Sequence, residues 1–197
     1  IEGGMVVTDD EDLHEALIMV RAHGWDRNFS KEKQKKLRNV YAVGAFYGKY
    51  TFYDLAYNFR PTDIQGFLGH TQLVYLEEII EKKEKNFRRI YDTISINKNI
   101  LPLRFETMER VSNFAVPIVA KDQNIFNLLR DRFEKAEVEI RPLIAGNITR
   151  QPFYKKYVEN ISHYPNADYL HEHAFYFGNH PELTKAELEF IERLLII

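Results

Sequence analysis

The stretch that decides the fold is Tyr57-Asn58-Phe59-Arg60-Pro61-Thr62-Asp63, which runs directly into the apolar residue Ile64. Pro61 pushes Arg60 out of the α region, so the residues before it are extended. Thr62 or Asp63 can accept hydrogen bonds from the first free N–H groups of a following helix. The stretch therefore predicts an extended approach to a helix N-terminus.

Apolar residues after this stretch recur at an approximately helical spacing. They are Ile64, Phe67, Leu68, Leu73, Leu76, Ile79, Ile80, Phe87, Ile90, Tyr91 and Ile94. The spacing predicts a helix, straight or bent, that reaches about residue 94.

Upstream, residues 4–8 are typical of a short strand, and Thr8 or Asp9 can cap a helix that ends near His23-Gly24. The chain opens on Ile1-Glu2-Gly3-Gly4, and a Gly pair before an apolar strand indicates close approach of another backbone. We therefore expect a further segment upstream that packs here. The basic residues 31–38 form a solvated helix or a mobile loop, with a plain surface segment favoured.

Downstream of residue 97 the pattern changes to shorter elements. Strands are predicted over residues 114–120, 138–140 and 174–177, and a helix over 124–135. Pro117 favours a sheet edge, and Thr184 with Glu187 forms a capping box for the last helix. We expect two domains, residues 1–95 and a small α+β domain over residues 96–197.

Composition excludes several classes of function. The chain is 45% apolar with a net charge of −2 and a pI near 6.4, which gives no electrostatic basis for binding nucleic acid or a membrane surface. It has no cysteine, so disulfides, thiolate metal sites and thiol nucleophiles are excluded. No apolar run approaches the roughly 20 residues of a membrane helix. We expect a cytoplasmic protein.

Two regions carry groups suited to ligand binding. The run His23-Gly24-Trp25-Asp26-Arg27-Asn28 offers a guanidinium for phosphate and an indole face for a ring, and the alternative is a helix end with a buried Trp and a surface ion pair. Asn58 and Arg60 precede a helix N-terminus, which favours an anion, although Asn there is often only a cap. From the residues alone the structural alternatives are favoured.

Two Gly-Asn turns follow predicted strands, at Gly146-Asn147 and Gly178-Asn179. Loops at strand ends often contact ligands, and Gly-Asn is also ordinary turn chemistry. His171 and His173 are two residues apart, which places them on different faces of a helix, so no metal pair is predicted.

Taken in order, these segments resemble the DegT/DnrJ/StrS family of pyridoxal-phosphate (PLP) enzymes acting on nucleotide sugars. The motifs that carry the resemblance are Glu2-Gly3-Gly4, Arg21-x-His23-Gly24, Tyr57-Asn58-Phe59-Arg60 and Ile64-Gln65-Gly66-x-Leu68-Gly69-x-x-Gln72-Leu73. Further motifs resemble the branch that contains GDP-4-keto-6-deoxy-mannose 3-dehydratase. They are Arg21-Ala22-His23-Gly24-Trp25-x-Arg27-Asn28, Arg141-Pro142-Leu143-x-Ala145-Gly146-Asn147, Asn166-Ala167-Asp168-Tyr169-Leu170 and Phe177-Gly178-Asn179-His180.

The resemblance implies an α/β fold class, namely the C-terminal portion of a PLP-dependent transferase fold of the aspartate aminotransferase type that ends in the small α+β domain. It also implies a homodimer, a nucleotide-linked hexose as substrate and glutamate as a possible amino donor. The implied cofactor is pyridoxal phosphate or pyridoxamine phosphate, with a site that is incomplete in this chain. Asn58 matches the family residue that reaches the cofactor phosphate of the partner subunit. His23, Arg27, Arg60, Asn147, Asn179 and His180 match positions near the sugar nucleotide or the subunit seam.

The catalytic position of the family lies a few residues before the Glu-Gly-Gly run, so we expect it upstream of Ile1. Aminotransferases carry a Schiff-base Lys there, and the dehydratase branch carries a His, which acts as acid and base without a covalent link to the cofactor. We therefore expect the complete protein to be an enzyme and the 197 residues alone to be inactive.

Three hypotheses follow. The preferred one is C3 deoxygenation of a nucleotide-linked 4-keto-6-deoxy sugar. The second is a sugar aminotransferase that uses glutamate. The third is a non-catalytic folding or dimerisation module, because no complete set of acid, base and nucleophile is visible here.

Overall fold

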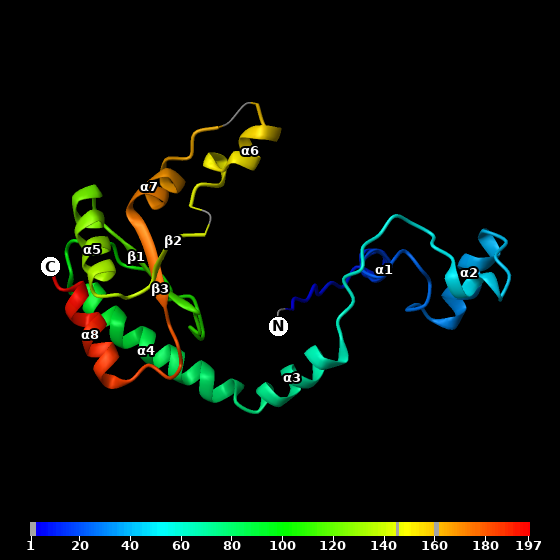
Figure 1. Cartoon of the computed structure of the whole chain (residues 1–197), viewed down its shortest axis with the longest axis horizontal. Coiled ribbons are helices and arrows are strands. Elements are labelled where there is room, and N and C mark those ends of the chain that lie inside the picture. Colours follow the sequence, from blue (N-terminus) through cyan, green and yellow to red (C-terminus); the bar gives the residue numbers. More distant parts are fainter. Residues whose placement is uncertain (1–2, 145, 160–161) are drawn as a thin grey trace. The chain divides into compact units, whose positions relative to one another are not determined.

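The computed structural model describes residues 3–144, 146–159 and 162–197, and it divides into two compact units, Ile1–Val74 and Tyr75–Ile197. Figure 1 shows the order of the elements along the chain. Glu2 and Ala145, which belong to two of the motifs above, lie outside the described residues. Each unit is described by itself.

The described part of the first unit is helical. Its elements are α1 Glu11–Val20, α2 Lys31–Val40, a 3-10 helix Tyr47–Tyr50 and α3 Asp63–Leu73. The cap of α1 is Asp10, whose Oδ1 accepts a hydrogen bond from Leu13 N at 3.0 Å, so the helix begins after the predicted cap residues Thr8 and Asp9. The predicted cap of α3 is confirmed, because Thr62 and Gln65 form a capping box.

The strand predicted over residues 4–8 is wrong, because residues 3–8 have no regular secondary structure. Val6 and Val7 are 68% and 85% exposed. A strand requires a neighbour that satisfies its backbone groups, and the described chain supplies none at this place.

Large apolar side chains of the first unit are mostly exposed. Neither α1 nor α3 contains a buried residue, and the buried apolar residues of this unit in the described chain are Ala22 and Trp25. The exposed ones include Met5, Phe46, Leu55, Phe67 and Val74. Exposure of so many large apolar side chains is typical of a region against which further protein packs.

Two helices replace the single helix predicted from Ile64 to about residue 94. α3 ends at Leu73, and α4 Leu76–Ile96 begins after a break at Val74 and Tyr75. Near the end of α3, Thr71 Oγ1 donates to Leu68 O at 2.8 Å, a bond that competes with helical geometry. The division of the chain into units at Val74 places α4 with the second unit. The boundary predicted at residue 95 concerns the domains of the complete enzyme and stays a prediction.

The second unit is built on a three-stranded antiparallel sheet in the order β1-β3-β2. The strands are β1 Ala115–Val119, β2 Ile140–Pro142 and β3 Ala174–Gly178. Ala115 pairs with Gly178 and Ile140 with Phe177. The outer strands β1 and β2 each contain a proline, Pro117 and Pro142, which confirms the predicted edge position of Pro117.

The second unit also contains five helices in its described residues. They are α4, α5 Gln123–Lys135, α6 Pro152–Tyr157, α7 Pro165–His173 and α8 Lys185–Leu195, with a 3-10 turn Ile148–Arg150. The predicted capping box of α8 is confirmed, because Thr184 N donates to Glu187 Oε2 at 2.7 Å and Glu187 N donates to Thr184 Oγ1 at 3.3 Å. The third predicted strand, residues 138–140, is shifted and begins at Ile140.

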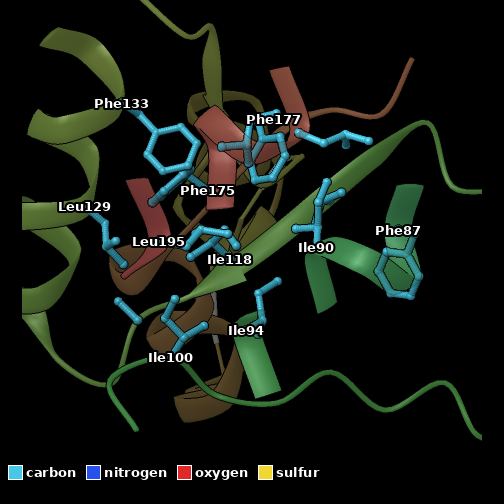
Figure 2. Packing of buried hydrophobic residues seen from close by; sticks show 14 of the residues in the cluster. Phe87, Ile90, Ile94, Ile100, Ile118, Leu129, Phe133, Phe175, Phe177 and Leu195 are labelled. Carbon is cyan, nitrogen blue, oxygen red and sulfur yellow. The ribbon is translucent and has the colours of Figure 1, made fainter. Parts of the chain in front are cut away.

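The core of the second unit lies between the sheet, α4, α5 and α8 (Figure 2). Phe133 of α5 contacts Phe175 and Phe177 of β3, with ring centroids 5.4 Å apart in both pairs. Ile90 and Ile94 bury one face of α4. Each fully buried side chain of this size contributes about 1.5–3 kcal/mol, so this core fixes the sheet whose ends carry the Gly-Asn turns.

Candidate functional site

Three predicted site residues of the first unit meet around the indole ring of Trp25, and a fourth, Asn58, is bonded to one of them. The centroid of that ring lies 4.7 Å from the His23 ring centroid, 4.0 Å from Arg27 Cζ and 5.2 Å from Arg60 Cζ. Arg60 Nε in turn donates to Asn58 Oδ1 at 3.0 Å. Guanidinium groups over an aromatic face are attracted to it and are held in a fixed orientation.

Backbone pairing brings these residues together. Ala22 and Asn58 form an isolated antiparallel bridge, so the segment before α3 runs beside the end of α1. Gly24 has a φ of +73°, and a Cβ at this position would collide with the carbonyl oxygen of Asp54. The predicted turn at His23-Gly24 is therefore confirmed and depends on glycine.

Arg27 stands beside a cationic cavity. Its Cζ lies 4.4 Å from the Tyr50 ring centroid, and its Nε donates to Lys49 O at 3.1 Å. The cavity has a volume of about 570 Å³, and its described lining contains four cationic side chains and no acid. The lining residues are Arg27, Lys31, Gln34, Arg38, Ala45, Gly48, Lys49 and Tyr50. Such a cavity favours an anionic ligand.

Arg38 is held by a buried carboxylate. Its Nε donates to Asp26 Oδ2 at 2.6 Å and its Nη2 to Asp26 Oδ1 at 3.1 Å, and the Asp26 side chain is completely buried. The hydrogen bond to Asp26 raises the pKa of Arg38. Residues 31–38 lie in α2, which confirms the helix alternative, and Gln34 is the one residue among them that is buried. The segment is nevertheless more than a plain surface helix, because Arg38 forms this pair with a buried carboxylate. The alternative of a surface ion pair beside a buried Trp is wrong in one respect, because the Asp26 side chain of the pair is completely buried.

In the second unit Asn147 is buried, and both the nitrogen and the oxygen of its side-chain amide form hydrogen bonds. Its Nδ2 donates to Asp168 Oδ1 at 2.8 Å, and its Oδ1 accepts from Thr149 N at 3.0 Å. Arg150 Nε donates to the same Asp168 oxygen at 2.5 Å. The hydrogen bonds from Asn147 and Arg150 lower the pKa of Asp168.

Asn179 is also buried, and its Nδ2 donates to Lys83 O at 3.0 Å and Asn113 O at 3.2 Å. It therefore ties the end of β3 to α4. His180 follows on the surface, where its Nδ1 accepts from Glu182 N at 3.1 Å and its carbonyl accepts from Asn86 Nδ2 at 3.0 Å. The side chains of Asn179 and His180 thus both form hydrogen bonds with backbone groups of this chain.

The predicted site residues thus fall into separate groups. His23, Arg27, Asn58 and Arg60 form one cluster in the first unit. In the second unit, Asn147 lies against α7, whereas Asn179 and His180 lie beside α4.

Sequence reasoning missed Lys31, Arg38, Lys49 and Tyr50 of the cationic cavity. Gln34 and Arg38 are four residues apart and so share one helix face, and a helical interpretation of residues 31–38 would have indicated a common role for them. Lys49 and Tyr50 belong to an irregular stretch that gives no periodic signal.

In the part of the chain that the structure describes, no group of three or more His, Cys, Asp or Glu side chains is placed to bind a metal ion. Within the same residues, none of the helices has both the length and the apolar character needed to cross a membrane.

Comparison with known proteins gives the relatives of this chain. GDP-4-keto-6-deoxy-D-mannose 3-dehydratase of Escherichia coli O55:H7 is 30% identical over 99% of this chain and 50% of its own length. A crystal structure of a GDP-4-keto-6-deoxymannose-3-dehydratase mutant with bound GDP-perosamine covers 96% of this chain and 49% of that chain, with 27% identity and a TM-score of 0.81. The chain therefore spans about half the length of these relatives.

Solved aminotransferases share the same fold. An aminotransferase of Helicobacter pylori that is involved in pseudoaminic acid biosynthesis covers 95% of this chain and 46% of that chain, with 20% identity and a TM-score of 0.72. Four dehydratase structures have TM-scores of 0.77 to 0.81, and four aminotransferase structures have scores of 0.68 to 0.72. The predicted fold class of a PLP-dependent transferase is thereby confirmed.

The sequence profile of the DegT/DnrJ/EryC1/StrS aminotransferase family matches residues 1–195. The match spans both units and all the motifs from Glu2 to His180 on which the resemblance rested. This chain belongs to the DegT/DnrJ/EryC1/StrS aminotransferase family.

Proposed function

We propose that this chain is part of a PLP-dependent enzyme that removes the C3 hydroxyl of a nucleotide-linked 4-keto-6-deoxy sugar. The observation that carries the proposal is a difference in TM-score. The solved 3-dehydratases have TM-scores of 0.77 to 0.81 with this chain, whereas the solved aminotransferases have TM-scores of 0.68 to 0.72. The activity belongs to the complete protein, because the matched relatives are about twice as long as this chain.

Asn58 and Arg60 fit one part of a cofactor site. Asn58 Oδ1 is occupied by Arg60, and among the described residues no group accepts a hydrogen bond from Asn58 Nδ2. An amide N–H beside a guanidinium suits a phosphate oxygen. Asn58 would hold the phosphate of the cofactor across a homodimer seam. Bound PLP supplies an electron sink for charge that develops on the substrate.

The cationic cavity of the first unit supports binding of a nucleotide diphosphate. Asp26 offsets the charge of Arg38, whereas Arg27, Lys31 and Lys49 have no acidic partner within ion-pair distance among the described residues. The indole Nε1–H of Trp25 is buried and has no acceptor in the described chain, which leaves one more donor for a ligand or for the rest of the enzyme. Arg27 would bind the diphosphate, and His23 and Arg60 would contact the sugar nucleotide around Trp25.

Asn147, Asn179 and His180 are proposed as residues near the sugar nucleotide or the subunit seam. The support is their place after the ends of β2 and β3, at the turns that carry the family motifs. The residue that decides the reaction is expected before the Glu-Gly-Gly run. A His there would move protons without a covalent link to the cofactor, and a Lys would favour amino transfer.

The test uses the product of the complete gene, loaded with PLP and supplied with glutamate and GDP-4-keto-6-deoxymannose. We expect a 3-deoxy keto sugar, identified by mass spectrometry and NMR. An aminated sugar that keeps its C3 hydroxyl would contradict the proposal. The codon at the catalytic position gives a second measurement, since His is expected and Lys would overturn the preferred branch.

The second candidate is a nucleotide-sugar aminotransferase that uses glutamate. It is favoured by the common fold with the Helicobacter pylori aminotransferase. The third is a non-catalytic module for folding or dimerisation, which the extensive exposed apolar surface of the first unit supports. We expect the 197 residues alone not to turn over substrate and not to bind PLP stoichiometrically, and a stoichiometric complex would overturn the third candidate.

A further inference from the structure

The motif Asn166-Ala167-Asp168-Tyr169-Leu170 has no role in the proposed function, although it lies on α7 beside one of the two Gly-Asn turns. Asp168 is its charged member. One oxygen of Asp168, Oδ1, accepts hydrogen bonds from Asn147 Nδ2 at 2.8 Å and from Arg150 Nε at 2.5 Å. The carboxylate therefore joins Asn147, which precedes the 3-10 turn, to Arg150, which is the last residue of that turn.

The bond to Asp168 fixes the orientation of the Asn147 amide. Asn147 is 3% exposed, and its Oδ1 accepts from both the backbone N (3.0 Å) and the Oγ1 (2.7 Å) of Thr149. The amide nitrogen must then face Asp168, because an exchange of the amide oxygen and nitrogen would oppose donor to donor and acceptor to acceptor.

His171, one turn further along α7, makes a second contact with the same loop. Its Nδ1 accepts a hydrogen bond from Asn147 N at 3.2 Å. Gly146, with a φ of +62°, lies directly against the imidazole, and a Cβ at this position would collide with Nδ1. In the neutral ring Nδ1 is then the acceptor and Nε2 carries the proton.

α7 is itself fixed to the sheet. The hydroxyl of Tyr169 lies 2.8 Å from the carbonyl oxygens of Ala120 and Lys121, which follow β1. The helix ends at His173 and continues without a loop into β3. A segment bonded to α7 is therefore held at a defined place over the sheet.

Between this segment and the sheet lies a cavity of about 340 Å³. Its polar lining residues are Arg141 of β2, Gln151 after the 3-10 turn, His171 of α7 and Tyr176 of β3. The rest of the lining is Gly146 with the apolar residues Pro142, Leu143 and Ile144. Nε and Nη2 of Arg141 donate to Glu139 Oε1, at 2.8 and 2.6 Å. The other guanidinium N–H groups of Arg141, the imidazole N–H and the phenol are donors that suit a ligand rich in oxygen acceptors.

We propose that Asp168 is a positioning residue, which holds residues 146–151 on α7 as the wall of a cavity that receives part of the nucleotide sugar. The proposal rests on the proposed function for the identity of the ligand. It assigns to Asn147 an indirect role, in which the side chain shapes the loop and leaves the contact with the ligand to the groups that line the cavity.

The first experiment measures the loop itself and needs no substrate. Asp168→Ala in the complete enzyme, without substrate, is compared with Asp122→Ala by hydrogen–deuterium exchange of the peptide that covers residues 146–151. Asp122 is a matched control, because its Oδ1 also accepts two hydrogen bonds, from Asn124 N and Ile125 N, at the start of α5. We expect faster exchange of this peptide in Asp168→Ala only. Equal exchange in the two variants would overturn the proposal.

The second experiment measures kinetics with the complete enzyme. Loss of a positioned wall should raise KM for the nucleotide sugar about tenfold or more, with kcat within about twofold of the unmodified enzyme. Asp122→Ala should leave KM unchanged, although it removes a comparable helix cap. An unchanged KM in Asp168→Ala, or an equal rise in both variants, would contradict a positioning role.

The two experiments separate the two proposals. If the unmodified enzyme does not convert the nucleotide sugar, the proposed function fails, and hydrogen exchange still decides whether Asp168 holds the loop. If conversion proceeds and KM does not respond to Asp168→Ala, the positioning role fails and the proposed function stands.

Discussion

Asp26 accepts two hydrogen bonds from Arg38, at 2.6 and 3.1 Å, although its side chain is completely buried in a unit that buries little else. Nη2 of Arg38 also donates to Gly48 O at 3.2 Å. The pair therefore connects the turn after α1, helix α2 and the 3-10 helix, and it holds Arg38 at the cationic cavity.

Arg38→Met should destabilise the first unit. It leaves the Asp26 carboxylate buried without its partner, which costs about 3–5 kcal/mol. Trp25 is the only tryptophan of the chain, so its fluorescence during urea unfolding reports on this unit. Lys35→Met, on an exposed position of the same helix, is the control. Coincident unfolding curves for the two variants would show that the pair contributes nothing.

Asn58→Ala should weaken cofactor binding by the complete enzyme. Loss of one charge-assisted contact to a phosphate costs about 1–3 kcal/mol, which corresponds to about 5- to 150-fold in affinity. Titration of the apoenzyme with PLP, followed by absorbance, measures the change. Asn39→Ala, which removes an exposed amide of α2, should have no effect. An unaltered affinity for Asn58→Ala would remove Asn58 from the site.

Thr184→Ala should lower the stability of the second unit at neutral pH by about 1 kcal/mol, because α8 loses its N-cap hydroxyl. Hydrogen bonds from the hydroxyl and the backbone N–H of Thr184 lower the pKa of Glu187. The stability linked to Glu187 is thus present above its unfolded pKa and is lost as pH falls through its folded pKa.

Urea unfolding followed by circular dichroism between about pH 5 and pH 3 measures this linkage. The unmodified chain should lose more stability over that range than Thr184→Ala or Glu187→Gln, since the first variant lacks the stabilising bond and the second cannot titrate. Glu189→Gln, on the same helix, should keep the full pH dependence. Parallel curves for all four proteins would contradict the linkage.

Phe133→Ala should cost about 3–5 kcal/mol, because it opens a cavity where Phe133 meets Phe175 and Phe177. Phe153→Ala is the control, since Phe153 is 55% exposed. Urea unfolding followed by circular dichroism compares the two, and a similar loss in both would place Phe133 outside the core.

The elements that the sequence predicted best carry their own start signals and a strong period. The helix 124–135, the N-cap at Thr62 and the capping box at Thr184 depend on residues a few positions apart, so they are visible in one stretch of chain. The strand over residues 4–8 was wrong because apolar composition alone does not supply a neighbouring strand. The break at Val74 was hidden because the apolar spacing continues across it.

The candidate site was predictable in its parts, and its assembly was not. The runs around Trp25 and Asn58 each indicated ligand chemistry, but nothing in either run specifies the bridge between Ala22 and Asn58 that brings them together. Asp26 gave no sign that its partner lies twelve residues away. Asn179 resembled an exposed turn residue, and the structure buries it because α4 supplies a carbonyl acceptor from a distant part of the chain.

The placement of Pro117 and Pro142 on the two outer strands has a consequence for self-association. An open sheet edge offers unpaired N–H and C=O groups to another molecule, and this is a common start of fibril growth. A proline on an edge strand interrupts the row of donors, since its nitrogen carries no hydrogen. Part of the β1 edge is also covered by residues 100–101, where Leu101 N donates to Val119 O at 2.8 Å. These features disfavour extension of the sheet of the second unit by strands of other molecules.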